Sequence, residues 1–207
     1  MAKDIERITD LASVRRRPGL YFNLESALVA NCMAREAYCL AIDQIAAGNC
    51  TRLTSEFCAN GFATVTHNGE PLGVDVKTEL QDSSAMLFVA ERLAFCAEHA
   101  ASDYVNAHVC KNGMTALNAC CERFELNNFH DNTHYRLTYE HGKRLADIEN
   151  LGKCKKRGVM IRFKPDATLI PVVEFDVQEL KQWFATIPVD QSGVTIEWHD
   201  HRETTTS

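Results

Sequence analysis

The sequence predicts an α+β fold in which helices pack on one face of a mixed β-sheet. The stretch 30–50 has apolar residues around much of a helical cylinder, which is typical of a helix packed against a sheet. Several short segments rich in β-branched and aromatic residues end at Gly, Asn or Pro and indicate strands. Helices come first, then strands, helices and strands again, so the order is not the regular alternation of a parallel α/β fold.

Helical spacing and turn residues define the first half of the chain. We expect a short amphipathic helix over 5–14, a turn at 17–19 and an apolar clasp at 20–22. The long helix follows over 30–50, with Gly48 and Asn49 as a C-cap. The next expected elements are strands over 51–59 and 61–66, a turn at 67–69, a helix over 84–99, a loop over 100–112 and a helix over 113–121.

The second half of the chain reads mainly as strands. The expected elements are a hairpin of strands 124–129 and 135–140 around the polar turn 130–134, a strand over 159–163 ended by Pro165, a helix over 175–185 and a strand over 194–198. The two tryptophans, Trp183 and Trp198, are expected to pack in or at the edge of the core. We predict one domain over 1–203 and a frayed tail over 204–207.

Composition narrows the class of protein. The 207 residues contain no apolar run of the roughly 20 residues that a membrane span needs, and the N-terminus has no signal-peptide block. The nine cysteines are odd in number and include no C-x-x-C pair, so we expect reduced thiols in a cytoplasmic protein. The net charge of -6 argues against direct DNA binding.

Four segments, in order, carry a resemblance to a known family. They are V-R-R-R-P-G-L-Y at 14–21, A-I-D-Q-I-A-A-G-N-C at 41–50, R-G-V-M-I-R-F-K-P-D at 157–166 and V-T-I-E-W-H-D-H-R at 194–202. With Y-E-H-G at 139–142, they resemble the N-terminal ATPase domain of the gyrase B and topoisomerase IV B-type subunits, of the GHKL ATPase superfamily. The resemblance covers nearly the whole chain and implies a GHKL-type two-layer sandwich.

The resemblance implies a catalytic base on the long helix. Family members carry E-x-x-D-N there, in which the Glu activates the attacking water and the Asn holds magnesium. Glu36 keeps the base position, whereas Leu40 stands at the metal-ligand position and has no oxygen for a hard cation. We therefore expect no metal site and a vestigial Glu36. On the helix alone, Glu36 and Asp43 also read as solvated acids at the edge of a buried face.

The adenine-binding motif of the family, D-x-G-x-G, falls on residues 67–71. The Asp that accepts a hydrogen bond from the adenine amino group is replaced by His67, while Asn68 and Gly69 follow and Pro71 replaces the second Gly. A proline lacks the backbone donor and fixes φ, which suits a loop around a nucleotide poorly.

Two further elements of the family's nucleotide site are altered. The phosphate-cradling lid, G-G-L-H-G-V-G in the family, falls on 107–113, where only Gly113 survives and Lys111 is a cation that could meet phosphate. The Thr that supports the adenine corresponds to Val159, which lacks the hydroxyl.

These changes predict a gyrase-B-like domain that has lost Mg-ATP binding and hydrolysis and acts as a binding or regulatory module. Losing one buried hydrogen-bond partner costs about 1–3 kcal/mol, so several losses approach the roughly 8 kcal/mol of a micromolar ligand. The expected partners are gyrase or topoisomerase IV subunits, and the segment 1–12 is the candidate for a homodimer contact. The H-D-H run at 199–201 reads as solvated rather than as a metal site.

Two alternatives remain open at this stage. One is a divergent ATPase or ATP-binding protein with a rebuilt site that uses His67, Asn68, Glu70 or Lys111, and only this reading needs ATP and magnesium as cofactors. The other is a binder of a small ligand in the vacated pocket. Its suggested walls are Glu36, Leu40, His67, Leu72 and Val159.

Overall fold

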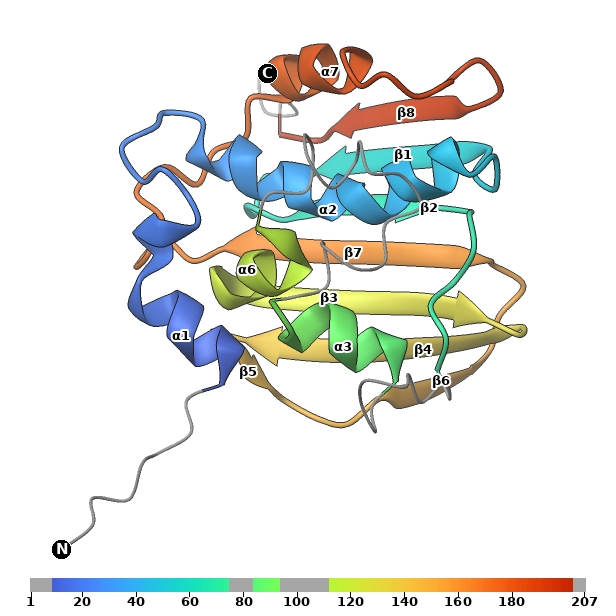
Figure 1. The fold of residues 1–207 in the computed structure, drawn as a ribbon, viewed down its shortest axis with the longest axis horizontal. Helices are drawn as coiled ribbons and strands as arrows, with labels where there is room; N and C mark the ends of the chain where they lie inside the picture. Colours follow the sequence, from blue (N-terminus) through green and yellow to red (C-terminus); the bar gives the residue numbers. More distant parts are fainter. Residues whose placement is uncertain (1–8, 75–83, 94–111, 203–207) are drawn as a thin grey trace, which may run out of the picture.

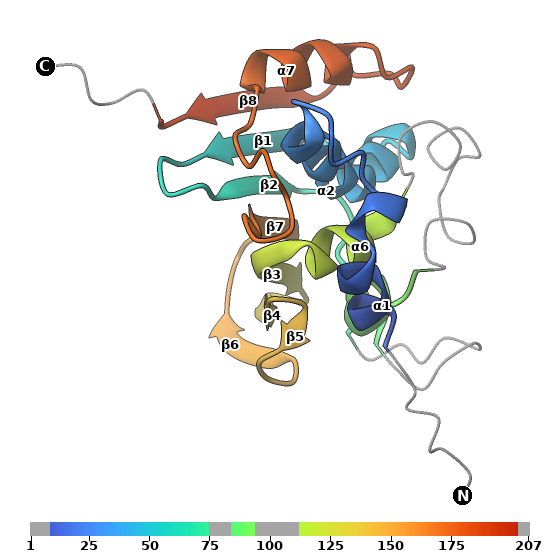
Figure 2. The ribbon, with the colours of Figure 1, turned by 90° about the vertical axis from the view of Figure 1, so that its left-hand side faces the viewer.

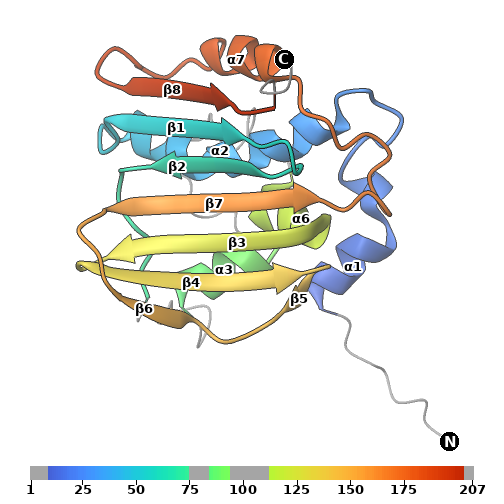
Figure 3. The ribbon, with the colours of Figure 1, turned by 180° about the vertical axis from the view of Figure 1, so that it is seen from behind.

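The structure is a computed structural model and describes residues 9–74, 84–93 and 112–202. Within these ranges one mixed sheet carries helices on one face, as predicted (Figure 1). Figure 2, turned by 90°, places α1, α2 and α6 on the same side of the sheet, and Figure 3 shows the other face without helices. The helices are α1 (Asp10–Arg16), η1 (Pro18–Leu20), α2 (Val29–Ala46), α3 (Ala85–Glu91), α6 (Gly113–Ala119) and α7 (Val177–Ala185).

The sheet has the strand order β5-β4-β3-β7-β2-β1-β8, and β6 also pairs with β4. The β1–β8 pair is parallel and the others are antiparallel, which makes the sheet mixed. The strands are β1 (Arg52–Phe57), β2 (Ala63–His67), β3 (Cys121–His130), β4 (Thr133–Glu140), β5 (Lys143–Arg144), β6 (Glu149–Lys153), β7 (Gly158–Pro165) and β8 (Thr195–Asp200).

Helix α2 is the centre of the core, because it is buried on most of its circumference. Tyr38 is fully buried and its hydroxyl donates to Ser55 Oγ of β1 at 2.9 Å, while its ring meets those of Trp183 and Trp198 at 5.8 and 5.7 Å. Both tryptophans pack against the core as predicted. Gly48, with φ of 72°, follows the end of the helix and supplies the left-handed turn that the sequence indicates.

One ion-pair cluster outside the candidate nucleotide site joins three of the sequence motifs. Arg15 and His141 contact the same oxygen of Asp166, at 2.7 and 2.8 Å. The Asp166 side chain is 2% exposed and also accepts hydrogen bonds from the amide and hydroxyl of Thr168. Burial alone would raise the pKa of Asp166, but the hydrogen bonds from Thr168, Arg15 and His141 outweigh it and hold this pKa well below its ordinary range. Segments 14–21, 139–142 and 157–166 therefore meet in the fold.

Several predicted boundaries differ from the structure. The first helix begins at Asp10, capped by Thr9, and residues 5–8 lie outside the described ranges. Only part of the apolar clasp expected at 20–22 packs against the core: Phe22 is buried, whereas Leu20 is 73% exposed. The helix expected over 84–99 ends at Glu91, since Arg92 is already extended, and residues 94–99 are not described.

The remaining differences concern strands. The helix expected over 113–121 ends earlier, and Cys121 already begins β3. The turn expected at 130–134 is tighter: only Asp131 and Asn132 separate the strands, with φ of 47° and 57°. The sequence does not predict strands β5 and β6, because they are polar and lack alternation. The loop 100–112, except for its last residue, and the tail 204–207 lie outside the described residues.

None of the described helices is long and apolar enough to cross a membrane.

Candidate functional site

Glu36 lies on α2 and is 3% exposed. Its carboxylate oxygens accept the backbone N–H groups of Asn112 and Gly113 at 3.2 and 3.0 Å. Helix α6 begins at Gly113 and has no hydrogen bond from the side chain of its own N-cap residue. Glu36 therefore caps the N-terminus of α6 although it belongs to α2, and its negative charge also interacts favourably with the positive end of the α6 dipole.

Leu40 follows Glu36 by about one turn and packs, partly buried, against the hydrophobic core. The position that the resemblance assigns to a magnesium ligand is thus occupied by an apolar contact. Two turns after Glu36, Asp43 has one carboxylate oxygen that is buried without a hydrogen-bond partner. Burial raises the pKa of Asp43 to about 6. The sequence alone does not predict this buried carboxylate oxygen or the raised pKa of Asp43.

His67 ends β2 and is 2% exposed. Its Nδ1 accepts the backbone N–H of Gly69 at 3.2 Å, so the neutral ring carries its proton on Nε2. That Nε2 is buried and has no hydrogen-bond partner. Burial lowers the pKa of His67 to about 4, which makes the ring neutral at pH 7. The side chain at the adenine-acceptor position is therefore a donor.

Asn68 and Gly69, which follow His67, hold the turn against β1 and α2. Asn68 Oδ1 accepts the backbone N–H groups of Thr51 and Arg52, at 3.0 and 2.9 Å, and so fixes the start of β1. At Gly69 an added Cβ would lie 2.6 Å from Cβ of Gln44, which explains why glycine occupies this position. The turn is thus pressed against α2 without room for a side chain.

Leu72 and Val159 are held next to this turn by β3. Asn128 accepts the backbone N–H of Leu72 at 2.9 Å and donates to its carbonyl at 2.8 Å. Val159 is 1% exposed and pairs in register with both His67 and Asn128. Asn128 is absent from the predicted site, although a fully buried Asn in a strand needs a specific partner.

The predicted site residues therefore form two groups joined by α2. One group contains Glu36 and Gly113 at the start of α6, and the other surrounds His67 at the end of β2 and Val159 near the start of β7. Lys111 and the rest of the lid segment 107–111 lie outside the described residues.

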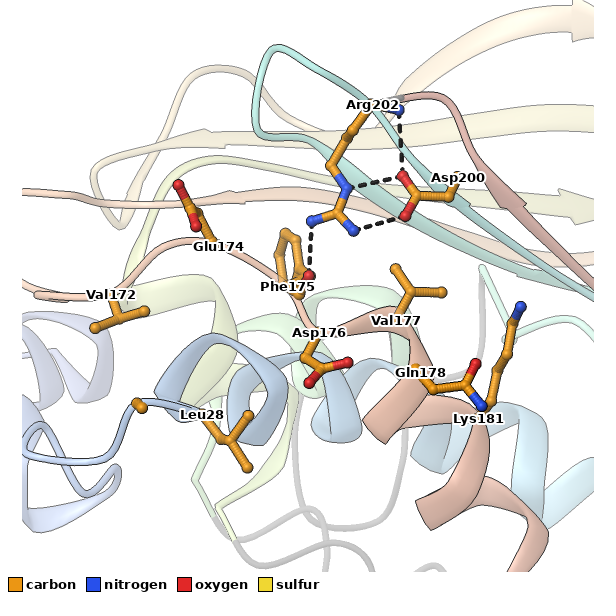
Figure 4. Close-up of a pocket in the computed structure, with 11 residues that line it drawn as sticks. Leu28, Val172, Glu174, Phe175, Asp176, Val177, Gln178, Lys181, Asp200 and Arg202 are labelled. Carbon is orange, nitrogen blue, oxygen red and sulfur yellow. Dashed lines mark hydrogen bonds and ion pairs between the residues drawn. The ribbon is translucent and has the colours of Figure 1, made fainter. Parts of the chain in front are cut away.

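The end of β8 borders a separate hollow of about 690 Å³ (Figure 4). Asp200 accepts two hydrogen bonds from the Arg202 guanidinium, at 2.8 and 2.6 Å, and the same guanidinium donates to the carbonyl of Phe175 at 2.6 Å. Through Arg202, Asp200 of the H-D-H run at 199–201 thus connects the end of β8 to the segment before α7. Among the described residues no group of three or more His, Cys, Asp or Glu side chains is placed to hold a metal ion.

Comparison with known proteins agrees with the resemblance in the sequence. The chain is 28% identical to the DNA gyrase B protein of Thermotoga maritima over 200 residues, which cover 96% of this chain and 31% of that protein. It is also 28% identical to the DNA gyrase B protein of Archaeoglobus fulgidus, covering 98% of this chain and 32% of the relative. The DNA topoisomerase 4 B protein of Escherichia coli is 28% identical, with 96% and 31% covered. No family model matches the chain.

The homologues of this chain are thus gyrase B and topoisomerase IV B proteins, as the motifs indicate, and the helices on one face of a mixed sheet are consistent with a GHKL-type fold. The chain spans about a third of the length of these relatives.

Proposed function

We propose that this chain is a gyrase-B-like domain, extending over residues 1–203, that no longer binds or hydrolyses Mg-ATP and that acts as a binding or regulatory module on type II topoisomerase subunits. The observation that carries the proposed loss of Mg-ATP binding is the protonation state of His67. It is neutral, and its buried Nε2–H is a donor at the position where the resemblance calls for an acceptor. An adenine amino group placed there would meet another donor, so both would stay unsatisfied at a cost of about 1–3 kcal/mol each.

The surroundings of Glu36 and Leu40 support the same proposal. A general base must reach the water that it activates. Both oxygens of Glu36 are already engaged by backbone N–H groups, and Leu40 offers packing in place of an oxygen ligand. Hydrolysis would require a water to reach the buried Glu36 carboxylate and a magnesium ion to find other ligands.

The loss of nucleotide binding is tested by restoring the family residues. The double variant His67→Asp, Leu40→Asn regains the acceptor and the metal-ligand oxygen, whereas Val159→Thr alone regains only a hydroxyl. We expect a nucleotide-dependent rise in melting temperature in the double variant with Mg-ATP and none in wild type. A comparable rise in wild type would overturn the proposal.

The partner assignment rests on the similarity to the gyrase B and topoisomerase 4 B proteins. The corresponding experiment is co-purification of the tagged chain with topoisomerase subunits of its native host, with a known subunit pair as the positive control. A clean negative beside a working control would exclude these partners. Sedimentation of the full chain and of a variant lacking residues 1–12 tests the proposed homodimer contact.

A second candidate function is favoured by one observation: His67 Nε2 and Asp43 Oδ1 are buried without partners, which a ligand could supply. This candidate is a rebuilt nucleotide site with ATPase activity, or a site for another small ligand. The ATPase form requires hydrolysis that Glu36→Ala abolishes. A rate that is unchanged by this substitution would exclude it.

A further inference from the structure

The face of the sheet away from the helices carries charged side chains that largely neutralise one another. Figure 3 shows this face without a covering helix. The ion pairs along it are Arg123–Glu125, Arg162–Glu125, Arg136–Glu149 and Lys164–Glu122. Pairs of this exposed kind contribute about 0–1 kcal/mol each, so they indicate a solvated surface rather than a source of stability.

One corner of this face differs from the rest. A hollow of about 320 Å³ lies where β1, β2 and β3 meet the connection between β6 and β7, and we call it the cationic hollow. It is lined by Arg52, Thr54, Thr66, His67, Asn68, Phe129, Lys156 and Arg157. Its charged lining residues are all cations, and none of the described residues that line it is acidic.

Two other hollows provide a comparison. The hollow beside β8 includes Glu174, Asp176 and Asp200, and a further one beside α1 includes Asp10 and Glu91. The cationic hollow is therefore set apart by its charge, on a protein whose net charge is -6. An anionic group that displaces Glu197 from Arg52 and Glu70 from Arg157 would meet three cations at this corner.

The floor of the cationic hollow combines an aromatic ring with hydroxyl groups. Phe129 stands opposite Gly158 in the register, so β7 contributes no side chain in this row. Thr54 and Thr66 are paired across β1 and β2. The ammonium group of Lys156 lies over the Phe129 ring, 5.6 Å from its centroid.

The cations can exchange their present partners at small cost. Arg52 pairs with Glu197 at 3.2 Å, and its side chain is 62% exposed. Arg157 pairs with Glu70, and both side chains are about half exposed. Because such exposed pairs are weak, an incoming carboxylate can replace the existing acid and form bidentate contacts with a guanidinium.

We propose that the cationic hollow binds an acidic peptide segment of a partner protein, with carboxylates on Arg52, Lys156 and Arg157. This inference rests on the proposed binding role and names the surface that performs it, but it does not depend on the loss of nucleotide binding. A hollow of about 320 Å³ holds a few side chains. A nucleic acid gains most of its affinity from a long track of phosphate contacts, which three cations in one hollow do not provide.

The test is fluorescence anisotropy with a labelled peptide of alternating Asp, Glu and Leu residues, compared with a peptide in which Asn and Gln replace the acids. The double variant Lys156→Glu, Arg157→Glu reverses two charges of the hollow. The control Lys143→Glu, Lys181→Glu makes the same net change elsewhere on the exposed surface. We expect binding of the acidic peptide to weaken at least about tenfold in the first variant and less than about twofold in the control.

Several results would overturn the inference. They are no binding of the acidic peptide by wild type, equal weakening in both double variants, or equal binding of the uncharged peptide. Tighter binding of a single-stranded DNA oligonucleotide, lost in the same first variant, would assign the surface to nucleic acid instead. Melting temperatures of both variants verify that they fold. A failed co-purification with topoisomerase subunits, together with intact peptide binding, would reject the partner class and keep this surface.

Discussion

Replacing His67 with Gln should remove a defined part of the pH dependence of stability. Gln keeps an acceptor for the Gly69 N–H but does not titrate. In the folded protein the pKa of His67 is lowered to about 4, while in the unfolded chain it takes its ordinary value of 6.5. Between these values the unfolded state binds the proton and the folded state does not, so stability falls as the pH falls from 6.5 to 4.

The magnitude follows from that difference. At about 1.4 kcal/mol for each pKa unit, the difference between the folded and unfolded pKa of His67 corresponds to a loss of roughly 3 kcal/mol in the free energy of unfolding. This is an upper value, because the folded chain can relax around the charged ring. The loss is complete near pH 4, and above pH 6.5 the residue contributes no pH dependence.

The assay is urea denaturation followed by tryptophan fluorescence at several pH values from 4.5 to 7.5. The quantity of interest is the difference in free energy of unfolding between wild type and His67→Gln, because other titrating groups cancel in it. We expect this difference to move by about 2 kcal/mol or more in favour of the variant as the pH falls. A pH-independent difference for His67→Gln would refute a neutral, buried His67.

The other predictions concern Asp43, Asp166 and Gly158. The pH dependence of stability that Asp43 contributes has the opposite sign to that of His67. The folded pKa of Asp43 is raised to about 6, so its contribution is present below the ordinary carboxyl pKa and is lost as the pH rises to 6. In urea titrations Asp43→Asn should therefore be more stable, relative to wild type, at pH 7 than at pH 4. Asp166→Asn should cost about 1.5–3 kcal/mol at pH 7, because it removes the charged partner that Arg15 and His141 share and leaves Arg15 only the Ala119 and Cys121 carbonyls. This difference should shrink as the pH falls below the ordinary carboxyl value. A cost under about 1 kcal/mol would contradict the importance of the cluster. Gly158→Ala should strongly destabilise the fold, because φ is 106° and the new Cβ would lie 1.9 Å from the carbonyl oxygen of His67; Gly193→Ala, with open space around it, should change the melting temperature little.

Much of the fold is predictable because local patterns and tertiary structure agree. The long helix is recognisable from apolar residues around its cylinder, and in the structure α2 is buried in that way. Strands β1, β2 and β7 are predictable for a similar reason, since they alternate or run apolar beneath that helix. The short strands β5 and β6 escape prediction because only pairing with β4 defines them, and neither carries an apolar face.

The candidate site is predictable in position but not in its contacts. Matching the motifs places His67 beside Val159, and the register of β2 and β7 confirms that they are neighbours. The sequence cannot reveal that Glu36 caps α6, because Gly113 is far away along the chain and only the fold brings its N–H to the carboxylate. The role of Asn128 is hidden for the same reason, since its amide recognises the backbone of Leu72 rather than any motif residue.

Titration calorimetry of the purified chain with a non-hydrolysable ATP analogue, with and without magnesium, tests the central claim most directly. A catalytically competent gyrase B ATPase domain serves as the positive control. The proposal predicts no binding heat at millimolar ligand, because His67 presents a donor, Leu40 offers no ligand oxygen and Glu36 is engaged by α6. Micromolar, magnesium-dependent binding would contradict it and make Glu36 the first residue to substitute.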